Sequence, residues 1–282
     1  MWTKGVQYIF PAIFRVVVSL LILTDIATGL LYTVDFYQNP DFIYYTGREG
    51  GFLETLRENI RLFLVAYGIV ILAFLFGIGK NFTAMLVFCF YFLEWLLLQP
   101  YSFVGDRFLR TSLLFFVFVN SFQYLSLSKR QAAWMPEQLS SLAVISLMLH
   151  TGLLYLANGI AKLRHRDWQQ GKAMDYFFNF SEEMDILGFG KTLSEYDVIF
   201  PAMGYVTIIF QLLFMIVMWV RPWKYVWMIM GVLIHGFMAI ILQLYKFEII
   251  ILLHFGFFLS EKEWRNILNL HRGWILNKRN NQ

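Results

Sequence analysis

The chain has 282 residues, of which 59% are hydrophobic and 19% aromatic, and its mean hydropathy is +0.57. A soluble domain is nearer half apolar, so this composition predicts a membrane protein with several spans. The net charge of +4 comes without a basic cluster interleaved with aromatic residues, which argues against a nucleic-acid partner. A single cysteine, Cys89, excludes an intramolecular disulfide and a cysteine-rich metal site.

Eight apolar runs are candidates for crossing the membrane, which takes about 20 apolar residues per helix. The sequence therefore predicts an all-α bundle of about eight transmembrane helices, forming one domain over 1–260. The segment 261–282 is basic with regularly spaced Trp, Ile and Leu, and we expect it to be a helix lying on the cytoplasmic membrane surface. The predicted spans are 8–33, 61–79, 82–100, 108–127, 140–162, 201–220, 223–244 and the short 247–260.

The orientation follows from Lys and Arg in the short segments that flank the spans. Placing both termini in the cytoplasm, with the chain in the inner membrane of a bacterial cell, leaves two long loops outside, 34–60 and 163–200. Most of the acidic residues fall in these loops. Both loops are also rich in aromatic residues, which disordered loops lack, so we expect them to be structured and to pack over the mouth of the bundle.

Three charged residues fall inside predicted spans, where a charge costs roughly 2.5–3.5 kcal/mol and usually faces the protein interior. Arg15 and Asp25 are ten residues apart in the first span, about 15 Å along a helix, so they cannot pair with each other. Each needs a partner on another helix, and Glu94 in the third span is a candidate for a cation. We expect all three to serve mainly as structural contacts between helices.

Histidines also occur in the apolar runs. His150, His235 and His254 are isolated, and an isolated histidine is more often a hydrogen-bonded packing residue than a functional one. Their spacing matches no metal pair on a single helix, so the sequence predicts no metal site.

Lys162 lies where the fifth predicted span meets the loop 163–200. Tyr155, Asn158 and Lys162 are spaced i, i+3, i+7 and line one helical face, while Gly152 and Gly159 allow close approach of another helix. A lysine half-buried among aromatic residues can act as a base. The alternative is a snorkelling anchor, which buries its stem and keeps its ammonium in water.

Four segments occur in an order that resembles the horizontally transferred transmembrane (HTTM) family, which includes the membrane domain of vitamin K-dependent gamma-carboxylase. They are FRVVVSLLILTDI (14–26), GDRFL (105–109), NGIAKLRHRDWQQGKAMDYFF (158–178) and the segment around His235. The third is the most specific, and the resemblance covers most of the chain. The residues that match its pattern are Gly159, Ile160, Lys162, Leu163, Asp167, Trp168, Gly171, Met174 and Tyr176.

The resemblance implies that Lys162 is a base that deprotonates a reduced quinone of the vitamin K or menaquinol type, and that His235 belongs to the same cavity. Asp106 stands where the carboxylase has a histidine proposed to assist catalysis, so we include it in the expected catalytic set. The residues expected around the cofactor are Asn158, Tyr155, Trp168 and His150. The carboxylase continues into a large lumenal region that grips its substrate, and this chain ends at 282. We therefore expect another substrate, or a partner that presents it.

Two functions follow from these features. The first is a membrane enzyme that acts on a quinol-like lipid, or modifies or matures a secreted peptide, at the outer face. The alternative is a non-enzymatic immunity, export or assembly subunit, since some family members resemble the membrane component of sporulation-delaying-type toxin systems. The expected partners are membrane lipids, and a secreted peptide precursor or small accessory protein. A transporter has less support, because no internal repeat is found and prolines lie at span ends.

Overall fold

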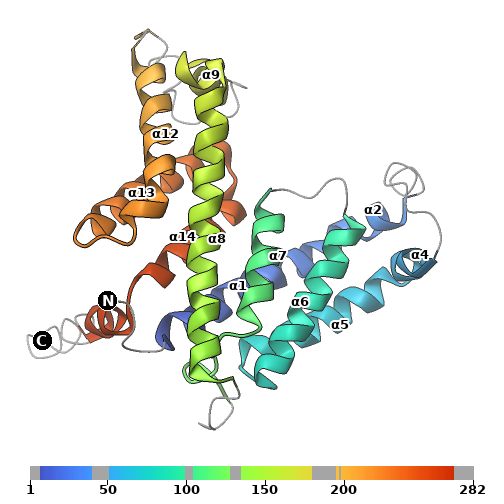
Figure 1. The fold of residues 1–282 in the computed structure, drawn as a ribbon. Coiled ribbons are helices and arrows are strands. Elements are labelled where there is room, and N and C mark those ends of the chain that lie inside the picture. Colours follow the sequence, from blue (N-terminus) through green and yellow to red (C-terminus); the bar gives the residue numbers. More distant parts are fainter. Residues whose placement is uncertain are drawn as a thin grey trace, which may run out of the picture. The chain divides into compact units, whose positions relative to one another are not determined.

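The computed structural model describes residues 7–39, 51–98, 104–127, 135–179, 195–196 and 198–269, and every regular element within them is a helix. The predicted all-α class is confirmed for this part of the chain. The polypeptide divides into two compact units (Figure 1). Unit 1 comprises residues 1–147 and 259–282, and unit 2 comprises residues 148–258. The prediction of one domain over 1–260 stays a prediction.

Unit 1 is a set of helices packed in chain order. Helix α1 packs on α5, α5 on α6 and α6 on α7. A π-helical turn, Gly29–Thr33, joins α1 to the short α2, and α4 meets α5 at an angle of 85°. The helices are α1 (Ile9–Thr28), α2 (Val34–Gln38), α4 (Gly51–Glu58), α5 (Ile60–Leu75), α6 (Lys80–Leu97), α7 (Val104–Phe116) and the first part of α8 (Glu137–Arg164).

Unit 2 begins within α8. Two short helices, α9 (Arg166–Gln169) and α10 (Lys172–Asn179), pack against α12, so part of the predicted loop 163–200 is structured. Helix α12 contacts α13, and α13 contacts α14. The break between α13 and α14 occurs at Gln243, which adopts a left-handed conformation with φ of 54°. The three longer helices are α12 (Ile199–Val217), α13 (Trp223–Leu242) and α14 (Tyr245–Phe255).

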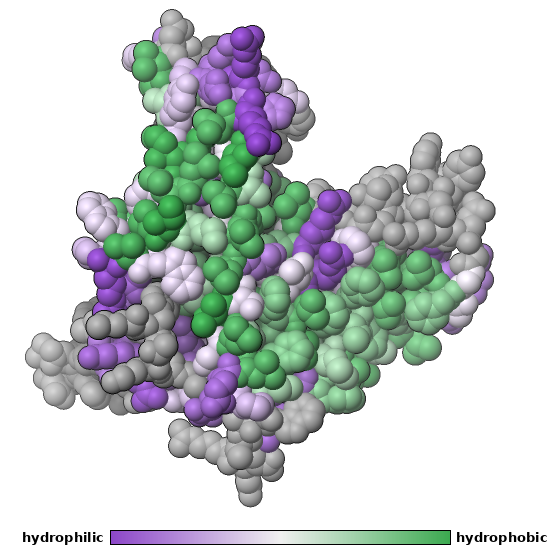
Figure 2. Space-filling model, in the orientation of Figure 1, coloured by the Kyte–Doolittle hydropathy of each residue, from purple (hydrophilic) through white to green (hydrophobic). Residues whose placement is uncertain are grey.

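Within the described residues, five helices are long and apolar enough to cross a membrane, and a sixth is counted if the bent pair α4–α5 forms one span. Large hydrophobic side chains are exposed along them, including Leu62 and Ile69 in unit 1 and Ile216 and Leu233 in unit 2. Figure 2 shows such side chains over α5 and α6 and over α8 and α12. These surfaces fit a lipid environment. The count of eight spans stays a prediction, because α7 and α14 have only 13 and 11 residues.

Some predictions fall on residues outside the described ranges. These include the aromatic residues Phe42, Tyr44, Tyr45 and Phe180 of the two long loops. The predicted C-terminal helix is confirmed over 261–269, and 270–282 lies outside the described residues.

The predicted helix over 108–127 is wrong in its second half, because α7 ends at Phe116. Polar side chains form hydrogen bonds with the main-chain groups of the irregular segment that follows α7. Asn81 donates from Nδ2 to the carbonyl oxygens of Val117 and Val119, at 2.7 and 3.2 Å. The main-chain N–H of Asn120 donates to the Ser140 hydroxyl at 2.9 Å. A non-helical segment is tolerated at membrane depth only when the protein itself satisfies its backbone in this way.

Arg15 on α1 is fully buried and directs its guanidinium group at main-chain oxygens. Its NH1 group donates to the carbonyls of Phe74 and Leu75 at the end of α5. The Nε and NH2 groups donate to carbonyls of the irregular segment that follows α7, at Ser121 (3.2 Å), Tyr124 (3.1 Å) and Leu125 (2.6 Å). Among the described residues, Arg15 is therefore held by carbonyls rather than by Glu94.

We expect the substitution Arg15→Lys to destabilise the protein strongly. Lysine keeps the charge but has three donors in place of five, so at least two buried carbonyls lose their partners, at about 1–3 kcal/mol each. The unfolding temperature in detergent should fall by about 10 °C, measured by intrinsic fluorescence. Arg61→Lys, at an exposed position of the same unit, is the control and should unfold like the wild type. Equal unfolding temperatures for both variants would contradict this role.

Candidate active site

The second half of α8 lies close against α12 because two glycines face that helix. A Cβ atom at Gly152 would come within 3.1 Å of the Met215 side chain. One at Gly159 would come within 3.0 Å of the main-chain nitrogen of Leu212. Since residue numbers rise along α8 as they fall along α12, the two helices are antiparallel. The close approach predicted from the two glycines is present, and it brings the Tyr155 ring onto Phe214, with ring centroids 4.0 Å apart.

Three polar side chains from three helices form a buried hydrogen-bonded chain in unit 2. The Tyr155 hydroxyl on α8 is hydrogen-bonded to Nε2 of His235 on α13. Nδ1 of the same imidazole is hydrogen-bonded to Oε2 of Glu248 on α14. The three residues are only 3%, 6% and 1% exposed. Phe210, Phe214 and Phe255 surround the Tyr155 ring, so the chain lies in an apolar setting.

This arrangement can hold and move a proton. A carboxylate that accepts the Nδ1–H of histidine fixes the tautomer and leaves the Nε2 lone pair pointing at the tyrosine hydroxyl. The same carboxylate balances the charge when Nε2 is protonated. The second oxygen of Glu248, Oε1, is buried and has no hydrogen-bond partner among the described residues.

Lys162 lies seven residues beyond Tyr155 on the same face of α8, about 10 Å along the axis. Its side chain is half-buried, and Nζ is 4.6 Å from the centroid of the Trp168 ring, within the range of a cation–π interaction. The intervening Asn158 donates from Nδ2 to the carbonyl of Leu154 at 2.9 Å, so its amide group is bound to the preceding turn of its own helix.

Trp168 is positioned by the packing of α9 on α12. Its main-chain carbonyl oxygen lies directly against Gly204, leaving no space for a side chain there. Gly171, with φ of +76°, turns the chain against Pro201 at the start of α12. These contacts hold the indole ring over the end of α8, where the Lys162 ammonium group lies.

The HTTM domain matches residues 8–264, nearly the whole chain. The chain belongs to the HTTM family. It is a membrane protein, and the family resemblance inferred from the motifs is confirmed. No curated protein and no solved structure gives a match.

The other expected site residues of the HTTM chain lie elsewhere. His150 is twelve residues before Lys162 on α8, about 18 Å along the axis. It lies close enough to His254 to act on it electrostatically, and His254 binds the carbonyl of Ile250 through Nδ1 at 2.7 Å. A role for His150 at a cofactor stays a prediction.

Asp106 and the three residues expected to be structural, Arg15, Asp25 and Glu94, belong to unit 1. Asp106 accepts a hydrogen bond at Oδ1 from the Tyr91 hydroxyl, at 3.2 Å. Its part in the chemistry of Lys162 and His235 stays a prediction.

Glu248 is the site residue that the sequence analysis missed. It falls in YKFEIIILLHF, near the start of the short eighth predicted span. A carboxylate in such an apolar run is as unexpected as Glu94, and the same criterion would have found it. Lys224 on α13, which the sequence places in a segment flanking two spans, is buried and donates from Nζ to the Phe258 carbonyl at 3.1 Å.

We expect Gly204→Ala to lower the unfolding temperature, because the added methyl group would collide with the Trp168 carbonyl oxygen. An overpacked site of this kind costs about 1–3 kcal/mol, which corresponds to several degrees. Gly236→Ala is the matched control, since a Cβ atom there meets nothing within 4 Å. The control should gain up to about 1 kcal/mol of helix propensity and unfold at or above the wild-type temperature. The reverse order of the two variants would contradict the packing of α9 on α12.

Proposed function

We propose that this HTTM chain is a membrane enzyme similar to the membrane domain of vitamin K-dependent gamma-carboxylase. It modifies or matures a secreted peptide, or acts on a quinol-like lipid, with Lys162 as the base. The observation that carries this proposal is the buried chain Tyr155–His235–Glu248. Burying an ionisable pair in apolar surroundings is costly, and replacing such a pair by apolar residues is often neutral or stabilising. A requirement for proton transfer explains why it is retained.

A reduced quinone fits the residues of unit 2. Glu248 Oε1 and Gln211 Oε1 are buried acceptors without hydrogen-bond partners among the described residues, and a quinol brings hydroxyl donors. The half-buried Trp168 ring offers a flat apolar surface, whereas Phe210 and Phe214 are buried against Trp227 and Tyr155. When bound, such a cofactor supplies an oxidisable ring whose reaction with oxygen can drive proton removal from a substrate.

The chain's own groups then have separate roles. Lys162 accepts a proton at Nζ, and the face of the Trp168 ring stabilises the resulting ammonium group. His235 takes a proton from the Tyr155 hydroxyl at Nε2, with Glu248 balancing the positive imidazole. The surrounding phenylalanine rings exclude water, which strengthens these electrostatic interactions.

We expect Lys162→Met, His235→Gln and Glu248→Gln each to lower product formation by about 100-fold or more, the usual scale for loss of a general base. Each variant is expressed in its native host, and mass spectrometry compares secreted peptides and the lipids that co-purify with the protein. Lys172→Met, an exposed lysine of α10, is the control and should keep wild-type product levels.

If all three variants retain full product levels, the enzymatic proposal fails. A stable protein partner that co-purifies equally with all of them would then favour the non-enzymatic alternative, an immunity, export or assembly subunit.

We also propose that the chain lies in the inner membrane with both termini cytoplasmic, so that α9 and the Lys162 end of α8 face outward. In a Cys89→Ser background, a membrane-impermeant maleimide should label Gln170→Cys in intact cells. Lys262→Cys, on the helical segment 261–269, should be labelled only after lysis. Both positions are exposed, so access differs only through the membrane. The opposite labelling pattern would reverse the orientation and place the site in the cytoplasm.

A further inference from the structure

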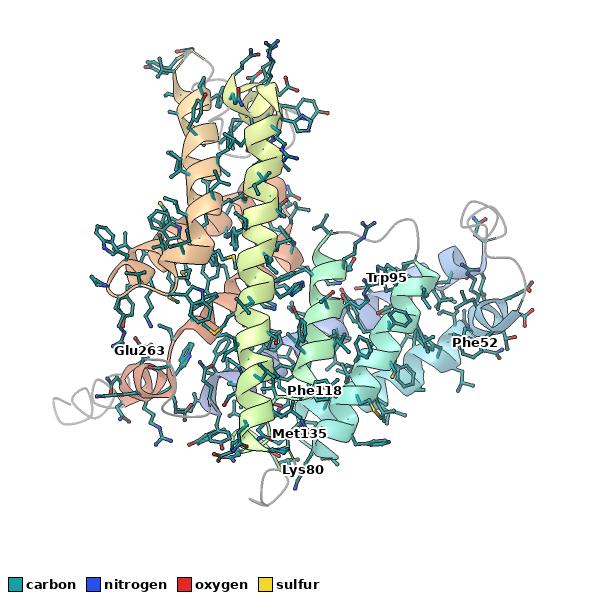
Figure 3. The ribbon with its side chains drawn as sticks, in the orientation of Figure 1. Phe52, Lys80, Trp95, Phe118, Met135 and Glu263 are labelled. Atoms are coloured by element: carbon teal, nitrogen blue, oxygen red, sulfur yellow. The ribbon has the colours of Figure 1, made fainter. Side chains whose placement is uncertain are left out.

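Two aromatic rings of unit 1 form a continuous surface near the C-terminal end of α6. Phe92 and Trp95 are stacked, with ring centroids 5.8 Å apart and 28° between the ring planes. Figure 3 shows Trp95 at the end of α6 opposite Lys80, where the helix begins. Since α6 is one of the helices long and apolar enough to cross a membrane, this end lies at the edge of the apolar layer, where tryptophan is enriched in membrane proteins.

The guanidinium group of Arg110, on the neighbouring helix α7, lies over both rings. Its Cζ atom is 3.7 Å from the centroid of Trp95 and 5.8 Å from that of Phe92. The shorter distance is van der Waals contact, so the group is held against the face of the indole. The Arg110 side chain is half-buried. The ring face stabilises the positive charge, but it supplies no oxygen acceptor to the five N–H groups of the guanidinium.

A second arginine, Arg107, precedes Arg110 by one helical turn and is exposed. Side chains three residues apart on a helix are neighbours, and the charge of Arg107 acts electrostatically on Arg110. Within the described residues, neither guanidinium group donates a hydrogen bond or forms an ion pair. Asp106, which comes directly before Arg107, accepts a hydrogen bond at Oδ1 from the Tyr91 hydroxyl. The two arginines therefore present like charges side by side, with N–H donors directed at no acceptor in this part of the chain.

An exposed apolar stripe runs along α6 and ends at these rings. Its four members are spaced i, i+3, i+7 and i+10, so they lie on one face of the helix, and each is exposed. They are Phe82, Met85, Cys89 and Phe92. Figure 2 shows apolar side chains over α5 and α6. A helical face of this kind contacts acyl chains in a membrane, so a lipid that lies along it brings its headgroup to the end of α6 where Arg110 lies.

The headgroup that suits this pair of arginines contains a phosphate group. Like charges at neighbouring helical positions repel each other, and an anion bound to both removes this repulsion. The oxygens of a phosphate accept two parallel N–H bonds from one guanidinium group, which a single-point acceptor cannot do. A zwitterionic headgroup would add a further cation beside the two arginines. A phospholipid with net negative charge is therefore favoured over a zwitterionic one.

We propose that Arg107 and Arg110 bind the phosphate group of an anionic phospholipid. Trp95 positions the Arg110 guanidinium group by contact with its ring face, and an acyl chain of the lipid lies along the apolar stripe of α6. Both arginines donate hydrogen bonds to the phosphate oxygens. This lipid site is independent of the chemistry proposed for Lys162.

The test uses the purified full-length chain in an uncharged detergent, titrated with dihexanoylphosphatidylglycerol, with dihexanoylphosphatidylcholine as the zwitterionic probe. At ten times its dissociation constant, the phosphatidylglycerol should raise the unfolding temperature by about 3 °C, and the phosphatidylcholine should give less than half of this shift. Arg107→Gln and Arg110→Gln should each at least halve the shift. Arg107 is exposed, so Arg107→Gln should unfold like the wild type without lipid. Arg61→Gln, at an exposed position of α5, removes the same charge and should keep the full shift.

Equal shifts from the two lipids, no shift in the wild type, or an undiminished shift in Arg107→Gln would overturn the proposal. A shift that Arg61→Gln reduces as much as Arg107→Gln would also overturn it, because the effect would then follow net charge alone. Sodium phosphate, compared with sodium chloride at equal ionic strength, should leave the unfolding temperature unchanged, and a shift equal to that of phosphatidylglycerol would assign the site to a free anion. In nanodiscs of equal phosphatidylglycerol and phosphatidylcholine, native mass spectrometry should find phosphatidylglycerol retained by the wild type and lost from Arg107→Gln.

Discussion

A main-chain carbonyl left unpaired inside a membrane must find its donor within the protein, because no water is available there. Arg15 meets this constraint in unit 1. Its guanidinium group joins the end of α5 to the irregular segment after α7, through carbonyls at Phe74, Leu75, Ser121, Tyr124 and Leu125. Asn81 donates hydrogen bonds to the carbonyls of Val117 and Val119, and the Ser140 hydroxyl accepts one from the main-chain N–H of Asn120. The polypeptide can therefore leave helical geometry after Phe116. The Arg15 guanidinium group also links α1 to the end of α5 and to the segment that follows α7.

The same constraint divides the polar groups of unit 2 into those that bind main-chain carbonyls and those that bind one another. Lys224, Trp227 and His254 each bind a main-chain carbonyl, at Phe258, Phe210 and Ile250 respectively. Each has a sufficient structural explanation. Tyr155, His235 and Glu248 instead bind one another. In the described part of the chain, Oε1 of Glu248 has no hydrogen-bond partner. Burying these three hydrogen-bonded side chains costs desolvation free energy, and their hydrogen bonds satisfy no carbonyl at a helix end. The functional proposal rests on this difference.

Local patterns in the sequence were enough to predict the helical class, most helix positions, the close approach at Gly152 and Gly159, and the family. They were insufficient where a structure depends on distant partners. The end of α7 follows from donors on α1 and α6, far away in sequence, whereas the apolar run itself continues to residue 127. Tyr155 and His235 are 80 residues apart, so only the family resemblance, and not the local pattern of either segment, predicts that they lie in one site. The local pattern around Lys162 is sufficient to single out this lysine. The position of the Trp168 ring over its ammonium group depends on the packing of α9 against Gly204, which the local pattern does not predict.

The surroundings of Lys162 bear on both interpretations of this residue, as a base and as a snorkelling anchor. A snorkelling lysine gains by extending its ammonium group into water, and it needs no fixed partner. Here the side chain is half-buried, and the ammonium group lies over an indole ring that the backbone of α12 holds in place. A ring face stabilises the protonated lysine but not the neutral amine. A base needs its product form stabilised in this way, because the proton that it takes from a weak acid must remain on it while the reaction proceeds. The fixed indole supports our proposal that Lys162 is the base, and its role as base or anchor stays a prediction.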